Sequence, residues 1–137
     1  MSLIKQLQEQ DDLVLGYRTD VRKNINARKS LFENGVFPFP KEYLSFLKEI
    51  NGIKGDDARV FGIDADEKSS FNDAVVQNIK LNRQDKDKVV VLGYNVFDYL
   101  VYDSGTKEYQ FRDKEDDVIV SVFGDFETSV MALLGIG

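Results

Sequence analysis

Residues 37–62 read FPFPKEYLSFLKEINGIKGDDARVFG, and this stretch contains the strongest local signals for the fold. Pro40 suits the first position of a helix, because its missing N–H would have no partner there. Apolar residues then recur on one helical face, and Asn51-Gly52 ends the pattern because glycine readily adopts the left-handed conformation that closes a helix. The stretch therefore predicts a helix over 41–51, a polar loop over 53–57 and a strand over 59–63.

The two halves of the chain differ in hydrophobic period. Apolar residues recur at helical spacing in the first half, whereas in the second half they form short runs or alternate with polar residues, as in strands. Further helices are predicted over 2–10, 20–32, 70–81 and a closing segment that starts at Asp125 or Thr128, and strands over 89–92, 99–102, 109–111 and 118–122. This order predicts an α+β fold with an antiparallel sheet of about four to six strands and helices packed on one face. No linker divides the chain, so residues 1–137 are expected to form a single domain.

Cysteine and histidine are both absent from the 137 residues. The chain therefore has no disulfides, thiol nucleophiles or imidazole ligands, and Ser-His-Asp and Cys-His catalysis are excluded. Carboxylate, lysine or tyrosine chemistry stays open, and Asp98, Tyr102 and Asp103 are candidates for it. The spacing of the two aspartates places them on opposite faces of a strand, so we predict that the protein is not an enzyme. Asp64 and Asp66 alternate as in a calcium loop, but the EF-hand spacing fails, so neither a metal nor another cofactor is expected.

Acidic residues outnumber basic ones by 24 to 18, which gives a formal net charge of -6. Such a chain repels phosphate backbones and attracts basic proteins, so we expect a protein partner and no nucleic acid. The basic stretch over 18–29 is interpreted as a solvated helix face, with RNA or membrane contact as the alternative. Neither a leader pattern nor an apolar run long enough to span a bilayer occurs, so we expect a cytoplasmic location and no membrane contact.

Acidic loops are the best candidates for a binding surface. The hypothesis is that one of them faces a basic partner protein and speeds its capture electrostatically; the alternative is that all of them are ordinary solvated turns. Phe37, Phe61 and Tyr94 would serve as binding anchors if exposed, although core burial is expected for each. The candidate partner-binding acids are Asp56, Asp57, Asp64, Asp66, Glu67, Asp113, Glu115, Asp116 and Asp117.

Several segments resemble, in the same order along the chain, the signature of the SUKH superfamily of bacterial immunity proteins and fungal cell-wall regulators. The resemblance runs over approximately residues 20–134. The chain departs from the family pattern in the long segment before Phe39, which holds an extra basic helix, and in its lack of tryptophan. The positions that carry the resemblance are Phe39, Pro40, Tyr43, Leu44, Phe46, Leu47, Asn51, Gly52, 60–62, 91–95, 98–103, Gly105 and 126–134, of which Pro40, Tyr43, Asn51, Gly52, Gly62, Gly93, Asp103 and Gly105 are taken as structural.

The resemblance implies an α+β fold and a non-catalytic role. Bacterial members commonly bind and block a cognate toxin, so the chain is expected to be an immunity protein that neutralises one. The alternative is a regulatory or scaffolding module that binds an endogenous protein. Gly62 and Gly93 are expected to relieve crowding at strand ends or bulges, with close approach of a ligand as the alternative. An edge strand could pair with another copy, so we expect a monomer or a weak homodimer.

Overall fold

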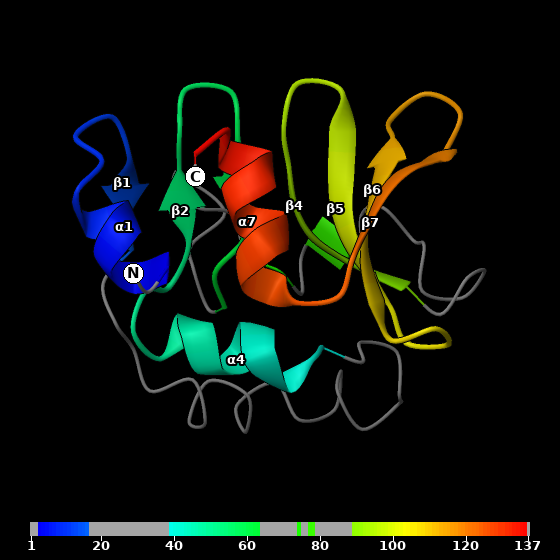
Figure 1. Cartoon of the computed structure of the whole chain (residues 1–137), viewed down its shortest axis with the longest axis horizontal. Coiled ribbons are helices and arrows are strands. Elements are labelled where there is room, and N and C mark those ends of the chain that lie inside the picture. The colour runs from blue at the N-terminus through cyan, green and yellow to red at the C-terminus, as the bar shows by residue number, and fades with distance from the viewer. Residues whose placement is uncertain (1–2, 17–38, 64–73, 75–76, 79–88, 137) are drawn as a thin grey trace.

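A single antiparallel sheet runs through the part of the chain that the computed structural model describes, namely residues 3–16, 39–63, 74, 77–78 and 89–136. Its seven strands lie side by side in chain order, each antiparallel to the next. Three helices with described bounds accompany the sheet, so the fold is α+β, as expected (Figure 1). The strands are β1 (Val14–Leu15), β2 (Ile53–Lys54), β3 (Arg59–Val60), β4 (Val89–Tyr94), β5 (Asp98–Asp103), β6 (Glu108–Asp113) and β7 (Ile119–Phe123); the helices are α1 (Leu3–Gln8), α4 (Lys41–Leu47) and α7 (Phe126–Leu134).

Two very short strands account for the difference between these seven strands and the four to six that we expected. Strands β1 and β2 have two residues each, too few to show a hydrophobic period. The polar loop expected over 53–57 is wrong at its start, because Ile53 is fully buried and lies between Leu15 and Val60 in the sheet. Tertiary pairing on both sides, and not the local sequence, makes this segment a strand.

Helix α4 is shorter than the helix predicted over 41–51. It ends at Leu47, and the backbone then continues through tight turns in which the Lys48 N–H donates to the Ser45 carbonyl. Pro40 is the N-cap residue and has an extended backbone, so it precedes the first helical position instead of occupying it. The helix predicted over 20–32 lies outside the described residues; of the one over 70–81, residues 74, 77 and 78 are described and are helical.

An aromatic cluster fixes α4 and α7 on one face of the sheet. The Phe126 ring of α7 lies 5.8 Å from Tyr43 and 5.2 Å from Phe46, both on α4, and 5.8 Å from Tyr109 on β6. The Tyr43 hydroxyl also donates to the Phe61 carbonyl beyond β3. Figure 1 shows α7 lying across the front of the sheet and α4 crossing below it. The two helices therefore share one core with the sheet.

Close backbone contacts explain two of the structural glycines. Gly93 follows a bulge in β4 and lies opposite Val60 of β3, and a Cβ atom at this position would approach the Arg59 carbonyl oxygen to 2.2 Å. A Cβ atom at Gly62 would approach the Asn51 carbonyl oxygen to 2.6 Å. Only glycine lets these backbone segments pack so closely. In both cases the neighbour is the chain itself and not a ligand.

Side-chain amides extend the hydrogen bonding of the sheet where strand pairing stops. Asn78 is fully buried, and its amide accepts from the Val91 N–H at 2.7 Å and donates to the Val91 carbonyl at 2.9 Å. Asn51 makes the same two hydrogen bonds with Ile63: its amide oxygen accepts from the Ile63 N–H at 2.9 Å, and its amide nitrogen donates to the Ile63 carbonyl at 3.1 Å. Each amide supplies the donor and the acceptor that a neighbouring strand would otherwise supply for one residue. Both asparagines therefore stabilise the fold by binding backbone groups that are distant in the sequence.

Replacing Asn78 by Ala is expected to lower the free energy of unfolding by about 2–3 kcal/mol, because the Val91 N–H and C=O would remain buried without these partners. Urea unfolding followed by circular dichroism measures the change. Asn95→Ala is the matched control, since the Asn95 amide oxygen accepts from the N–H groups of Phe97 and Asp98 in a turn that water reaches. There we expect a loss of about 0.5–1 kcal/mol. Equal losses in the two variants would contradict the role of Asn78.

Candidate protein-binding surface

The meander brings three turns to the same end of the sheet. Successive antiparallel strands reverse direction, so the β2–β3, β4–β5 and β6–β7 connections all lie at the upper end in Figure 1. These connections hold two of the acidic groups predicted to bind a partner. Six exposed side chains of these turns define the surface that we call the acidic end, namely Asp56, Asp57, Val96, Phe97, Glu115 and Asp116.

The β2–β3 turn presents Asp56 and Asp57 to solvent. The turn is closed by a hydrogen bond from the Gly55 N–H to the Ala58 carbonyl at 2.9 Å. Arg59 follows it and donates to the same two residues, reaching the Gly55 carbonyl at 2.7 Å and the Ala58 carbonyl at 2.9 Å. The guanidinium therefore braces the turn through backbone oxygens and leaves both carboxylates directed to solvent.

Two of the acids in the β6–β7 turn also hold its backbone. The Asp113 Oδ1 accepts from the N–H groups of Glu115 and Asp116 at 2.8 and 3.3 Å. The Asp116 Oδ1 accepts from the Val118 N–H at 3.0 Å. These bonds are typical of aspartates in turns and satisfy neutral donors, so the negative charge of the turn is retained. Asp113 and Asp116 thus have a structural role as well as a charge.

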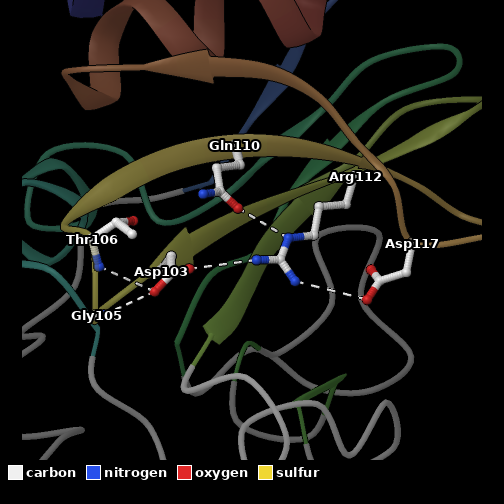
Figure 2. Close-up of polar contacts among 6 residues, drawn as sticks. All are labelled: Asp103, Gly105, Thr106, Gln110, Arg112 and Asp117. Carbon is white, nitrogen blue, oxygen red and sulfur yellow. Dashed lines mark hydrogen bonds and ion pairs between the residues drawn. The ribbon is translucent and has the colours of Figure 1, made fainter.

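Asp117 differs from its neighbours because it contacts a buried cation. Its Oδ2 lies 3.7 Å from Arg112 on β6, and Asp103 at the end of β5 approaches the same guanidinium to 3.5 Å (Figure 2). The Arg112 side chain is only 8% exposed, whereas that of Asp117 is 40% exposed. Asp103 also accepts from the N–H of Gly105, which fixes the β5–β6 turn. The main role of Asp117 and Asp103 is therefore to stabilise the sheet, and they contribute little to the charge of its surface.

Exposed apolar side chains adjoin these acids. Phe97 in the β4–β5 turn is 74% exposed and Val96 beside it is 52% exposed. The Lys114 N–H donates to the Phe97 carbonyl at 3.0 Å, so the backbone of the β4–β5 turn is bonded to that of the acidic β6–β7 turn. The Lys114 ammonium lies over the Tyr94 ring, 4.6 Å from its centroid. An aromatic ring held at a rigid turn beside carboxylates is suited to entering a pocket on a partner protein.

Strand β7 continues this apolar surface along the edge of the sheet. Val118, Val120 and Val122 are 57%, 56% and 51% exposed, and Ile119 is 47% exposed. Their alternation predicted a strand, and β7 confirms it over Ile119–Phe123. Alternation alone left open which side faces the core, and in the structure the valine row is the exposed one. Sequence reasoning therefore missed these residues as surface candidates.

The remaining predicted sites are distributed differently. Phe61 is buried and Tyr94 is half-buried, so neither offers an exposed anchor. Phe37 and the acids Asp64, Asp66 and Glu67 lie outside the described residues. Among the residues that the structure describes, no three acidic side chains come together to form a metal site.

Asp98 and Asp103, considered above as a carboxylate pair, lie at opposite ends of β5. Asp98 pairs with Asp113, and Asp103 pairs with Glu108 at the other end of the sheet. The structure therefore does not bring them together. No helix in the described part of the chain combines the length and apolar character needed to cross a bilayer.

The acidity of Tyr109 is strongly altered by its surroundings. Burial, reinforced by the Glu42 carboxylate, raises the pKa of the Tyr109 phenol far above its usual range. The phenol is therefore protonated at neutral pH, and it donates to Glu42 Oε1 at 3.3 Å. The second oxygen of Glu42 accepts from the Phe126 N–H, also at 3.3 Å. Tyr109 and Glu42 line a depression of about 470 Å³ with Pro40, Lys41, Tyr102 and Lys107. Their polar atoms are used to join α4, β6 and α7 to each other.

Two comparisons with known proteins identify no relative of this chain. A scan against protein-family models finds no family that matches this chain, and a search of curated proteins finds no match. The likeness to the SUKH superfamily therefore stays a prediction that depends on the motif residues. The acidic end and the exposed β7 are the features from which function can be argued.

Proposed function

We propose that this protein is a non-catalytic binding domain that captures and neutralises a cognate bacterial toxin. The observation that carries the proposal is the acidic end, where Phe97, 74% exposed, stands on a rigid turn between two acidic turns. Tight protein interfaces combine a few apolar anchors with a polar rim. The likeness to immunity proteins supports the choice of a toxin as partner, and the absence of cysteine fits action in the reducing cytoplasm.

Charge supports a basic partner. The chain has a net charge of -6, and the carboxylates of Asp56, Asp57 and Glu115 are exposed at the same end of the sheet. A local field of this sign raises the rate at which a basic protein is captured, while the apolar anchors determine how long it stays bound. Neutralisation would then be stoichiometric, with the partner's active surface covered by this end of the domain.

Reversing the three exposed acids (Asp56→Lys, Asp57→Lys and Glu115→Lys together) is expected to slow association by about 10–100-fold at low ionic strength. The probe is the toxin domain that the proposal expects a neighbouring gene to encode, and stopped-flow fluorescence measures the rate. Bacteria that produce the toxin should survive with the unaltered protein and lose much of that protection with the variant.

The matched control carries the same change of charge at the other end of the strands. Glu49 precedes β2, Glu108 begins β6 and Glu127 follows β7, and their side chains are exposed or half-exposed. Their joint replacement by Lys alters the net charge equally, so a smaller effect on the rate isolates the location of the charge. Equal slowing by the two triple variants would refute the acidic end as the capture surface. Failure of the unaltered protein to protect cells would favour the alternative, a regulatory module with an endogenous partner.

A further inference from the structure

Strand β7 is an edge strand without a neighbour on its outer side in the part of the chain that the structure describes. It is the last strand of the sheet and pairs with β6 on its inner side only. Along an edge, alternate N–H and C=O groups point outward and can pair with another strand. The five residues of β7 contain no charge and no proline. The edge is therefore chemically able to accept an additional strand.

Most devices that protect natural edge strands are missing here. Edges are commonly blocked by lysine, by proline, by an inward-pointing charge or by a bulge. Strand β7 has a bulge near Val120, where its pairing with Phe111 and Arg112 shifts by one residue. The segment after the bulge, Ser121–Phe123, pairs in regular register with β6. That regular segment, with Val122 half-exposed, offers the best outer edge for pairing.

From this edge and the charges around it, we infer that β7 binds an extended segment of a partner protein as an added β-strand, apolar at alternate positions and flanked by basic residues. The inference rests on the proposed function and specifies how the partner is held. Exposed acidic residues flank β7 on both sides, with Glu115 and Asp116 before it and Asp125 and Glu127 after it. Residues 113–127 contain six acids and only one lysine. Basic residues at both ends of an incoming strand would therefore meet opposite charge.

The same charges argue against a second copy of this chain as the occupant. A two-fold dimer would pair β7 with itself in antiparallel orientation. The end that carries Glu115 and Asp116 would then lie against the partner end that carries Asp125 and Glu127. Like charges opposite one another destabilise paired strands. The apolar centre of β7 would pair well with itself, but both ends would repel, whereas a basic strand is attracted at both ends.

The experiment uses a synthetic nine-residue peptide with valine and threonine alternating over five central residues and two lysines at each end. We expect amide NMR shifts concentrated on β7 when the peptide is added to the isotope-labelled full chain. A peptide with glutamates in place of the lysines should bind at least about tenfold more weakly at low salt, because both of its ends meet like charge. Shifts spread over the surface, or equal binding of the two peptides, would overturn the inference.

Backbone methylation separates strand addition from simple side-chain contact. A strand that joins an edge donates every second N–H to it, so N-methylation at one set of alternate positions should abolish binding while methylation at the other set should not. Equal tolerance of both sets would refute an added strand. Val122→Lys should weaken peptide binding at least about tenfold by placing a lysine on the edge. Val14→Lys is the matched control, because Val14 on β1 is also 51% exposed but lies on the opposite edge.

Further outcomes distinguish this inference from the proposed function. If Val122→Lys still protects cells from the toxin as well as the unaltered protein does, strand addition is refuted while toxin neutralisation stands. If the peptide binds at β7 but no toxin is neutralised, the edge site stands and the proposed function fails. Sedimentation that shows a dimer of the unaltered protein and a monomer of Val122→Lys would assign the edge to a second copy and overturn the inference.

Discussion

Replacing Phe126 by Ala is expected to lower the free energy of unfolding by about 3–5 kcal/mol, which is the usual cost of removing a buried aromatic ring. Phe126 is 2% exposed, and its ring contacts Tyr43, Phe46 and Tyr109 at centroid distances of 5.2 to 5.8 Å. These contacts join both helices to the sheet, so the cavity would open where three elements meet. Chemical denaturation of the purified variant measures the loss.

Phe97→Ala is the control for this prediction, because it makes the same substitution at a ring that is 74% exposed. A surface substitution of this kind is expected to change stability by no more than about 0.5 kcal/mol. The same variant should weaken toxin binding if Phe97 is an anchor, so the pair separates a stability residue from a binding residue. Similar stability losses at the two positions would show that Phe126 is not central to the core.

The second large effect is expected at Arg112, whose replacement by Ala should lower the free energy of unfolding by about 3 kcal/mol. Its guanidinium lies between Asp103 and Asp117, and its Nε donates to Gln110 Oε1 at 3.0 Å (Figure 2). Removing the cation would leave Asp103, whose side chain is 16% exposed, beside another acid without that counter-charge. Thermal and urea unfolding at neutral pH measure the effect.

A double-mutant cycle with Asp103→Asn tests whether the ion pair is the cause. The asparagine can still accept the turn hydrogen bonds from the N–H groups of Gly105 and Thr106, so the substitution removes chiefly the charge. The double variant should be more stable than the sum of the single losses predicts, by about 1 kcal/mol, since the attraction between Arg112 and Asp103 is lost only once. Strictly additive losses would mean that Arg112 contributes through packing and not through its charge.

Elements with complete local signals were predicted well from the sequence. The closing helix is confirmed as α7, which starts after Asp125 and ends before Gly135. Asp125 accepts from the Thr128 N–H at 2.8 Å, and Gly135 has a left-handed φ of 70°, as expected for residues that begin and end helices. Both signals act within a few residues of the helix. Strands β4 and β5 extend the predicted 89–92 and 99–102 by one or two residues at their ends.

Patterns that depend on distant partners misled the prediction. In β6, Tyr109 and Phe111 alternate with polar residues, a pattern typical of a strand with one face in water. Gln110 and Arg112 are nevertheless 2% and 7% exposed. In β7 the row of valines, which resembles a core face, is half-exposed. A period of two shows only which residues share a face of the strand. Which of the two faces is buried depends on the elements that pack against it.

The candidate site was predicted in part. The acids at Asp56, Asp57 and Glu115 were identified as surface groups, and they lie exposed at one end of the sheet. The sequence did not indicate that these turns lie at the same end, or that Phe97 is held between them. This grouping follows from the chain order of the seven strands, which places every second connection at the same end.

The amino-acid sequence by itself determined the caps of the closing helix, the turn residues, the positions of the longer strands and the acidic balance, because each depends on neighbours a few residues away or on composition alone. Only the tertiary structure decided that Ile53 pairs on both sides, that Arg112 is buried, and that the valines of β7 are exposed. The physical reason is that burial and pairing are set by partners far along the chain, and a single sequence does not specify those partners.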